Sequence, residues 1–486
     1  MKPALRTAIV HYHCRPGGVT NVIRNAIAAL RRLNIAAVAL TGQPPGRVCA
    51  DGHFRCVEGL DYGEADSSLP PDLLAERLKT AAAAALDGAP DIWHIHNHAL
   101  GKNPVLTAAV AGLAVEGRRI LLQIHDFAED GRPANYGRLK TSFGAGGAWQ
   151  NLPLYPQAAH VHYAVLNRRD EGWLLAAGAD ARRVHWLPNA VFLPGGETLS
   201  KQAGPARWVY PTRAIRRKNI GEFLLWAVLS KGGEQYALTL APTNPVDCAV
   251  YERWKFLAAG WKLPVEFEAG LRAGSAGDIP WWRQGNGAFT TSVAEGFGLA
   301  FLEPWLAGLP LVGRDLPEIT RDLKSSGIDL SMLYPRLAVP LKWLDADGLK
   351  NQMRLRLRET WRAYGQEPSA DAVARAWGAA ADDAGTIDFG RLDENTQAEV
   401  IGLLQKCASR KDELHHSAVP AEQARRAVPA NASRVREQFS LDSYGKRLAA
   451  IYGEIMAAPS GPVQALPMEA LLARILDPAR FNLLRT

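Results

Sequence analysis

The sequence lacks any long uninterrupted run of apolar residues. The longest runs, such as "TAAAAAL" at residues 80–86, fall well short of the roughly 20 residues that a membrane-spanning helix needs. The first eighteen residues hold only the three-residue apolar run "AIV" before His11, which is too short for the core of a signal peptide. We therefore expect a soluble, cytoplasmic protein.

Cysteine is scarce. The 486 residues contain five cysteines, an odd number with no CxxC pair. This pattern argues against a disulfide framework and against a zinc ribbon. We expect all five to be reduced and structural: Cys14, Cys49, Cys56, Cys248 and Cys407.

A strong excess of one charge is also missing. Fifty-six basic against forty-nine acidic side chains give a net charge of +7, which fits phosphorylated ligands, anionic lipid or a plain solvated surface. Two basic clusters stand out, "RAIRRKN" and "LRRLN". We expect no nucleic-acid partner. For the second, peripheral contact with an anionic membrane is the alternative to simple solvation.

What the sequence does have is a repeated alternation of β-rich and helix-compatible segments. The first half contains apolar runs without polar alternation, which are typical of parallel strands buried on both faces. A Gly-, Pro- and Ser-rich stretch at residues 192–206 indicates a linker, and the alternation then restarts. The predicted strands are 7–13, 36–42, 91–97, 119–127, 160–167 and 183–191 in the first half, and 207–213, 236–242, 265–271, 287–293 and 309–315 in the second.

Beyond about residue 349 the pattern becomes helical. Residues 349–436 are rich in Ala and Arg with few strand signals, which predicts a helical extension. Residues 436–456 predict one amphipathic helix, opened by a Ser440 or Asp442 cap. Its predicted apolar face contains Tyr444, Leu448, Ile451, Tyr452 and Ile455.

The segment "AEGFGLAFLE" places two acids around a glycine-bracketed phenylalanine. In a doubly wound sheet, ligands bind beyond the carboxyl ends of the strands. We predict a strand through Thr290, a glycine loop, and a helix from about Leu299 whose amides favour an anion near residues 297–299. Glu295 and Glu303 are good acceptors for sugar hydroxyls, so the segment predicts a site for a phosphorylated sugar.

The motif resembles the donor site of retaining GT-B glycosyltransferases of family 4, in which two glutamates are separated by seven residues. Other segments resemble the same family: "YPTRAIRRKNIGEFL", "PGGVTNVIRNAIAAL", "VHWLPNAV", "DLPEI" and the terminal "FSLDSYGKRLAAIY". The similarity spans residues 7–345 and about 437–457. It departs from the family pattern in "PW" after Glu303 and in "RD" before Leu316.

The resemblance implies roles for matched residues. Arg213 and Lys218 bind the donor diphosphate and are expected to stabilise its growing charge. Glu303 contacts the ribose. The sugar-diphosphate end is assigned to Glu295, Phe297, Gly298 and Leu299. With two protein cations present, and with the metal independence that the fold implies, we expect no metal and no cofactor other than the nucleotide-diphosphate sugar itself.

In the first half, Gly17 and Gly18 lie between a strand and a helix, so their amides can approach the diphosphate on domain closure. The resemblance implies a catalytic histidine at His125, beside Asp126 as a candidate for acceptor contact. "HIHNH" places three histidines on one face of a strand. With no carboxylate pair nearby, we expect His96 or His98 to line the acceptor cleft rather than to hold a metal.

These inferences predict an α/β protein of GT-B type, with two Rossmann-like doubly wound domains, a central cleft and a C-terminal crossover helix. Residues 1–197 form the acceptor-side domain and 203–436 the nucleotide-sugar domain with its helical extension. Residues 437–486 are expected to pack back on the first domain. The predicted function is retaining transfer of a hexose to a hydroxyl. The alternatives are a phosphorylase- or epimerase-like enzyme and a non-catalytic nucleotide-sugar-binding protein.

Overall fold

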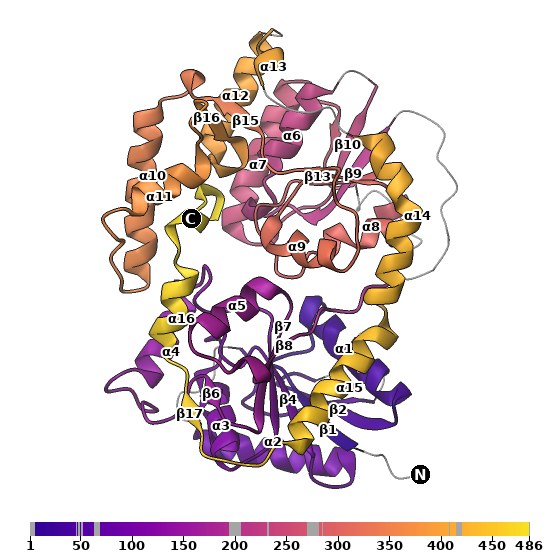
Figure 1. The fold of residues 1–486 in the computed structure, drawn as a ribbon, viewed down its shortest axis with the longest axis vertical. Helices are drawn as coiled ribbons and strands as arrows, with labels where there is room; N and C mark the ends of the chain where they lie inside the picture. Colours follow the sequence, from indigo (N-terminus) through magenta and orange to yellow (C-terminus); the bar gives the residue numbers. More distant parts are fainter. Residues whose placement is uncertain are drawn as a thin grey trace. The chain divides into compact units, whose positions relative to one another are not determined.

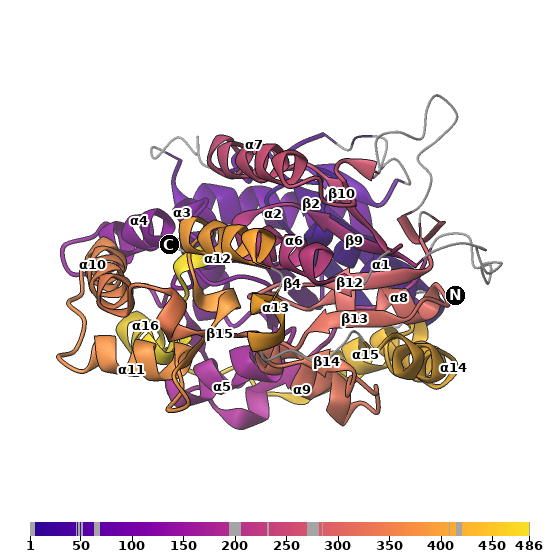
Figure 2. The same cartoon turned by 90° about the horizontal axis from the view of Figure 1, so that it is seen from above.

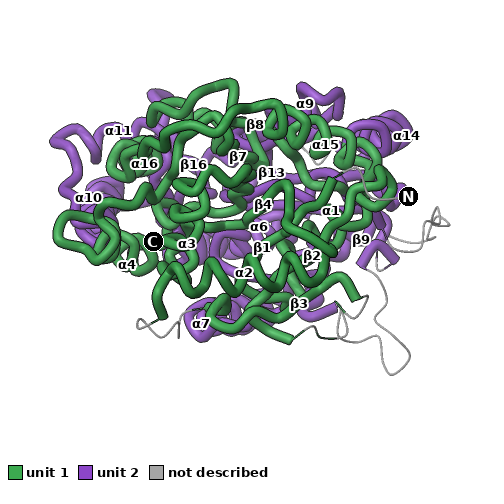
Figure 3. The backbone as a smooth tube through the Cα atoms, turned by 90° about the horizontal axis from the view of Figure 1, so that it is seen from below, with its two compact units in different colours: residues 1–190, 439–477 green, residues 191–438, 478–486 purple. Residues whose placement is uncertain are grey.

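Two parallel sheets organise the chain, one in each of two compact units (Figure 3). Unit 1 contains Met1–Ala190 and Phe439–Asp477, and unit 2 contains Val191–Gln438 and Pro478–Thr486. The computed structural model describes residues 5–485 except 45, 47–48, 50–51, 63–68, 194–205, 231–232, 270–280, 284, 408 and 415–419. Most of the predicted linker, and the end of the predicted strand 265–271, lie outside the described residues. None of the described helices is both long enough and apolar enough to span a membrane.

Unit 1 has a seven-stranded sheet in the order β3-β2-β1-β4-β5-β7-β8. All neighbouring strands in it are parallel, and β4, β5 and β7 are buried throughout. Its strands are β1 Leu5–Val10, β2 Ile35–Thr41, β3 Phe54–Cys56, β4 Ile92–His96, β5 Ile120–Ile124, β7 Val161–Val165 and β8 Val184–Trp186. Its helices are α1 Gly18–Arg32, α2 Pro71–Leu86, α3 Pro104–Val115, α4 Pro133–Phe143, α5 Arg168–Ala176, α15 Leu441–Ala457 and α16 Met468–Ile475. A small antiparallel pair joins β6 Pro156–Gln157 to β17 Gln464–Ala465.

The return of the chain to unit 1 depends on α15. Ser440 caps it by accepting a hydrogen bond from the Ser443 amide at 3.2 Å, so Ser440 rather than Asp442 is the cap. The predicted apolar face is buried. It packs with the apolar face of α1 in one core cluster, and the two helices lie side by side (Figure 1). An amphipathic helix of this kind is held by burial of its apolar face.

Unit 2 has a six-stranded sheet in the order β11-β10-β9-β12-β13-β14. Figure 2 shows β10, β9, β12, β13 and β14 side by side. The strands are β9 Arg207–Arg213, β10 Gln235–Leu240, β11 Val265–Glu266, β12 Gly287–Thr290, β13 Leu311–Arg314 and β14 Leu333–Tyr334. The accompanying helices are α6 Ile220–Leu229, α7 Pro245–Gly260, α8 Glu303–Leu306 and α9 Pro317–Ser325. All neighbouring pairs are parallel.

The predicted helical extension is not purely helical. Helices α10 Ala346–Ala363, α11 Ala372–Ala380, α12 Glu394–Lys406, α13 Arg410–Glu413 and α14 Ala421–Gln438 are present. A strand, β16 Thr386–Asp388, lies among them and pairs antiparallel with β15 Ala338–Pro340. The sequence places the whole tail, residues 437–486, with the first domain. The structure groups Pro478–Thr486 with unit 2, where its first residues contact α11.

Candidate functional site

The basic segment of unit 2 follows the carboxyl end of β9. Arg213 is the last residue of that strand, and its exposed side chain donates to the Ala241 carbonyl at 3.4 Å. A single turn of 3-10 helix, Arg216–Lys218, then leads to Asn219, which has φ 54°. This left-handed conformation is one that asparagine tolerates. It turns the chain into α6 and leaves Lys218 just after the strand end.

Lys218 forms an ion pair with Glu295, the first acid of the "EGFGLAFLE" motif. Their side chains are only 13% and 10% exposed. Ser292 also donates to Glu295, at 2.7 Å, and its oxygen lies 2.7 Å from the Tyr210 hydroxyl. The structure therefore brings together two predicted site residues and adds Ser292, which sequence reasoning missed.

The backbone on both sides of this pair is tied down. Thr291 donates to the Lys218 carbonyl at 2.9 Å, and the Val293 amide donates to the Arg217 carbonyl at 3.0 Å. These bonds join the loop after β12 to the turn after β9. The ion pair is consequently held by a rigid frame at the carboxyl ends of two adjacent strands.

Several charges compete to set the pKa of Glu295. Burial alone would raise that pKa, but the charges of Lys218 and Arg217, with hydrogen bonds from Lys218 and Ser292, lower it below its usual value. The carboxyl group is therefore ionised at neutral pH. Because an ammonium has three donors, Lys218 can hold Glu295 and still donate to an anion.

Glu303 occupies a different environment from the one predicted. Instead of a helix from Leu299, the structure has a 3-10 turn, Leu299–Phe301, a break at Leu302, and the four-residue α8 starting at Glu303. Pro304 explains the break, since proline has no amide to donate and is accepted only in the first turn of a helix. A helical turn therefore starts at Leu299 as predicted, with Gly298 as its N-cap, but Glu303 is the first residue of a second, short helix instead of lying one turn inside the first. An anion on the amides of residues 297–299 stays a prediction.

The Glu303 carboxylate is half-buried and has no hydrogen-bond or ion-pair partner among the residues that the structure describes. Burial raises its pKa to about 7. A carboxylate left in this state is ready to accept hydrogen bonds from a ligand.

Between the two acids, Gly298 meets a conformational requirement. Its φ is +87°, and a Cβ there would lie 2.8 Å from Ile319 and 2.9 Å from Phe301. Only glycine fits both conditions. Phe297 is buried, whereas the Leu299 side chain is 39% exposed.

A pocket of about 210 Å³ lies at the carboxyl ends of β12 and β13. Its lining includes Val293, whose amide bonds the Arg217 carbonyl in the Lys218–Glu295 frame, and the "LPE" segment after β13. Arg391, Arg480 and Arg485 also line it. Sequence reasoning missed these arginines because they come from the extension and the tail, which carry no recognisable motif.

A larger pocket of about 860 Å³ is lined by residues such as Arg207, Gln235 and Val265. These residues lie at the amino ends of β9 and β10 and in β11. Ligands of doubly wound sheets bind at the opposite, carboxyl ends. We therefore place the candidate site at the smaller pocket and the adjoining Lys218–Glu295 frame.

The "RD" departure from the family pattern has a structural explanation. The buried Arg314 donates to Glu222 of α6 and to Asp388 of β16, with contacts of 2.6–3.1 Å. Burial alone would lower the pKa of Arg314, but the two carboxylates hold it well above its usual value. Arg314 therefore fastens the extension to the sheet.

In unit 1, Gly17 and Gly18 are exposed at the start of α1, and no side chain caps this helix. Gly17 is extended, with φ 172°. A Cβ on Gly18 would meet nothing within 4 Å, and one on Gly17 only the Arg15 carbonyl at 3.9 Å. Packing within the described residues therefore does not require either glycine.

His125 follows β5 and is buried. Its Nε2 lies 2.8 Å from Nδ1 of His96, the last residue of β4, and the two rings are stacked. Asn97 accepts the amides of His125 and Asp126 at 2.7 and 3.2 Å. Burial lowers the pKa of His125 to about 4, so the imidazole is neutral at pH 7. The structure brings His125, His96 and Asp126 together and adds Asn97 as the residue that orients them.

The prediction that three histidines share one face is wrong for His98. The strand ends at His96, and Asn97 has φ 54°, which changes the direction of the chain. His98 is fully buried and bonds the Leu154 carbonyl at 3.2 Å. Its position therefore favours a structural role over acceptor contact.

Asp126 and His94 have partners of their own. Asp126 is about two-fifths exposed and pairs with Arg132 at 2.6 Å. His94 is buried between Gln123, at 2.8 Å, and the Tyr452 hydroxyl, at 2.9 Å. Of the two, only Asp126 is placed to meet a ligand.

No family model matches the chain. A curated relative, mannosylglucosyl-3-phosphoglycerate synthase of Petrotoga mobilis, is 29% identical over 380 residues, which is 71% of each chain. A glycosyltransferase structure from Rickettsia africae has a TM-score of 0.55 at 13% identity, and covers 93% of this chain and 99% of that one. Anabaena HepE, in complex with UDP and glucose, has a TM-score of 0.53 at 12% identity, with 92% and 99% coverage. Sucrose-phosphate synthase from Thermosynechococcus elongatus has 0.52 at 14% identity, with 93% and 99% coverage.

The two parallel-sheet units and these similarities define the fold as GT-B, as predicted from the sequence. The similar structures named above are glycosyltransferases, and the curated relative is a glycosyl synthase.

Proposed function

We propose that the protein is a retaining glycosyltransferase that moves a hexose from a nucleotide-diphosphate sugar to an acceptor hydroxyl. The comparisons support glycosyl transfer from a nucleotide sugar. The observation that carries the proposal is the ion pair of Lys218 with Glu295 after the carboxyl ends of β9 and β12. Glu303, in the same motif, has no partner among the residues that the structure describes.

Unit 2 is proposed to bind the donor. Lys218 and Arg213 neutralise the diphosphate, Glu303 accepts hydrogen bonds from the ribose, and Glu295 accepts them from the transferred sugar. The exposed Arg217 adds a third cation to this end of the site. Cations fixed before the reaction stabilise negative charge as it develops, which is often the largest contribution to catalysis. We propose that this makes a divalent metal unnecessary for the transfer.

The proposed chemistry breaks the bond between the anomeric carbon and the diphosphate oxygen. The acceptor oxygen forms the new bond on the same face, and its proton goes to the departing phosphate. Neutral His125 is proposed to contact the sugar, with Asp126 toward the acceptor. Gly17 and Gly18 are proposed to offer amides to the diphosphate, for which their lack of side chains leaves room.

The curated relative narrows the substrates to try first. Its name describes a synthase of mannosylglucosyl-3-phosphoglycerate. Removal of the mannosyl group from that product leaves glucosyl-3-phosphoglycerate. We propose a mannosyl donor and this acceptor as the first pair to assay.

Titration calorimetry without metal tests the donor site, using UDP, GDP, ADP and their glucose and mannose conjugates. Selective binding of one diphosphate supports the proposal and names the base. Proton NMR of the product then gives its anomeric configuration, and inversion would refute the retaining mechanism. An isomerised sugar with no acceptor present would instead indicate an epimerase, and binding without turnover a regulator.

A further inference from the structure

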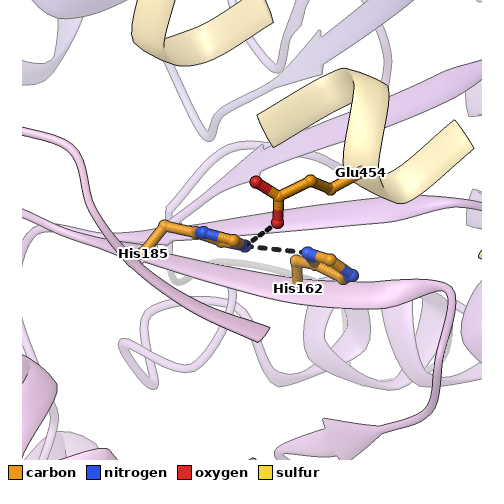
Figure 4. A group of neighbouring side chains, drawn as sticks. All are labelled: His162, His185 and Glu454. Atoms are coloured by element: carbon orange, nitrogen blue, oxygen red, sulfur yellow. Dashed lines mark hydrogen bonds and ion pairs between the residues drawn. The ribbon is translucent and has the colours of Figure 1, made fainter. Parts of the chain in front are cut away.

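Three side chains in unit 1 converge away from every residue assigned to the donor or the acceptor. They are His162 on β7, His185 on β8 and Glu454 on α15, and Figure 4 shows the two rings and the carboxylate pointing toward one another. They come from segments up to 292 residues apart in sequence, the difference between 454 and 162. No sequence motif links them.

The distances between the nitrogen and oxygen atoms of these three side chains are close to those of a metal site, so only small movements are needed to bind an ion. One ligand atom from each residue lies within 4.8 Å of the others. His162 Nδ1 is 2.8 Å from His185 Nε2, which is 3.9 Å from a Glu454 oxygen. Ligands at about 2.0–2.2 Å from a tetrahedral Zn²⁺ are roughly 3.3–3.6 Å apart. Shifts of under an ångström would therefore bring three donors around one ion.

The orientation of His162 also suits a ligand. Its Nε2 lies 3.2 Å from the Ala159 carbonyl, which can only accept, so Nε2 carries the proton. Nδ1 is left with its lone pair, and that is the atom that faces His185. In protein metal sites the second nitrogen of a ligating histidine is commonly fixed to a carbonyl in this way.

Charge and exposure complete the arrangement. His162 is buried and the His185 side chain is only 15% exposed, so the ring atoms that face one another are shielded from bulk water. The positive charge of Arg183 acts on His162, but Arg183 is paired with Asp180 at 3.4 Å. Glu454 is 56% exposed and supplies a negative charge from the solvent side. A fourth position is thereby open to water.

We propose that His162, His185 and Glu454 bind one divalent transition-metal ion, with Zn²⁺ the best match to two imidazoles and a carboxylate. The ion would join α15 to β7 and to β8, which is an edge strand of the unit 1 sheet. Its role would be structural, because it would tie the returning helix to the sheet. This proposal does not depend on the proposed function.

The test uses full-length protein without an affinity tag, stripped of metal by EDTA and dialysed. Zn²⁺ is titrated by calorimetry, and Co²⁺ is added as a spectroscopic probe whose visible absorption reports its ligands. We expect one equivalent of Zn²⁺ to bind and to raise the melting temperature. Failure to bind, or binding without stabilisation of the fold, would overturn the proposal.

Variants locate the site. Glu454→Gln changes a mostly exposed side chain, so the fold should survive, and we expect at least a tenfold loss of Zn²⁺ affinity. His185→Ala should abolish binding and alter the Co²⁺ spectrum. His53→Ala, a histidine elsewhere in unit 1 that contacts Arg31 at 2.9 Å, should leave the affinity unchanged. Wild-type Zn²⁺ affinity in both Glu454→Gln and His185→Ala would refute the site. So would loss of Zn²⁺ binding in His96→Asn when the other variants still bind.

Discussion

The carboxyl ends of the two sheets carry different chemistry on the same topology. In unit 1, the strands β1, β4 and β5 end at or just before His11, His96 and His125, all buried. In unit 2, β9 and β12 lead to the charged pair of Lys218 and Glu295. One end is therefore lined by imidazoles and the other by formal charges.

The difference follows from what each group costs to bury. Burial lowers the pKa of His11 to about 3 and that of His125 to about 4, so these rings stay neutral and pay no charge penalty. Lysine and glutamate can remain charged inside a protein only when paired. The neutral histidines at these strand ends of unit 1 can thus hydrogen-bond uncharged groups such as hydroxyls, whereas the strand ends of unit 2 carry charged side chains.

Acid should destabilise unit 1 more than unit 2, and this difference in stability is the largest effect that we expect. Eight buried or partly buried histidines of unit 1 have pKa values lowered by burial below 6.5, mostly to about 3–4. The unfolded chain therefore binds more protons between about pH 6.5 and 4, and stability is lost as the pH falls through this window. Each histidine loses up to about 1.4 kcal/mol per pH unit, so unit 1 should weaken by several kcal/mol at pH 5.

Hydrogen exchange at pH 7 and pH 5, corrected for the intrinsic rate, measures this loss. Peptides from β4, β5 and β7 should lose protection before those from β9 and β12. Two acids of unit 1 oppose the trend, because burial raises the pKa of Glu129 to about 7 and of Asp170 to about 6. They are outnumbered by the histidines. Earlier loss in unit 2 would contradict the comparison.

Breaking the buried charges of unit 2 should have the next largest effect. Arg314→Ala leaves Glu222 and Asp388 buried without their cation. Loss of one partner from a buried ion pair costs about 3–5 kcal/mol. Urea unfolding should show this loss, which Glu222→Gln and Asp388→Asn added to Arg314→Met should partly restore.

Arg356→Ala is the matched control for that experiment. Its pair with Glu359, at 2.8 Å, is about half exposed, and such pairs contribute at most about 1 kcal/mol. Equal losses in the two arginine variants would show that burial of charge is not what distinguishes unit 2.

The Arg314 cluster also marks the limit of sequence reasoning. The strands could be predicted because unalternated apolar runs persist over five to seven residues, and the α15 face because its spacing is helical. The "RD" before Leu316 registered only as a departure from a family pattern. Its partner Asp388 lies 74 residues on, in a segment without strand signals, so no local pattern joins the two.

The site was predictable to a similar degree. The spacing of Glu295 and Glu303 and the position of Lys218 follow from a local motif. The break at Leu302 depends on one proline, Pro304. The prediction of a single helix from Leu299 through Glu303 did not take this proline into account. Asn97 changes the direction of the chain after β4 through a left-handed conformation. The pattern of residues in the strand does not indicate that the strand ends at His96.

Removing Lys218 should act mainly on rate. Its loss of stability should be smaller than that of Arg314→Ala, because it leaves one buried carboxylate without a cation instead of two. Lys218→Ala is expected to lower kcat by about 10²–10³-fold, the loss typical of one preorganised charge donor. Steady-state kinetics with the donor identified by calorimetry measures it. Far-UV circular dichroism should show an unchanged fold.

Lys255→Ala is a matched control, since Lys255 also pairs with a glutamate, Glu268, at 3.0 Å. That pair lines the larger pocket at the amino ends of the strands. Its loss should leave kcat unchanged. A near-normal rate for Lys218→Ala, or an equal drop in both variants, would refute the diphosphate assignment.

The smallest effect is expected at Glu303. It tests whether unit 2 keeps this carboxylate without a partner so that it can bind a ligand. Burial raises the pKa of Glu303 to about 7, so the folded protein holds its proton more tightly than the unfolded chain. Stability from this group is therefore lost as the pH rises from about 4.5 through 7. Glu303→Gln should gain about 1–2 kcal/mol over wild type at pH 8, after allowance for solvent, and nothing at pH 4.5.

The same variant should bind the nucleoside diphosphate roughly tenfold more weakly, the change that 1.4 kcal/mol produces, because a carboxylate that accepts two ribose hydroxyls has been replaced by an amide with one acceptor. Melting curves at the two pH values and calorimetry at pH 8 measure both quantities. A purely structural glutamate would give a stability change with unchanged affinity. A gain in stability joined to a loss of affinity is what a residue kept strained for its ligand produces.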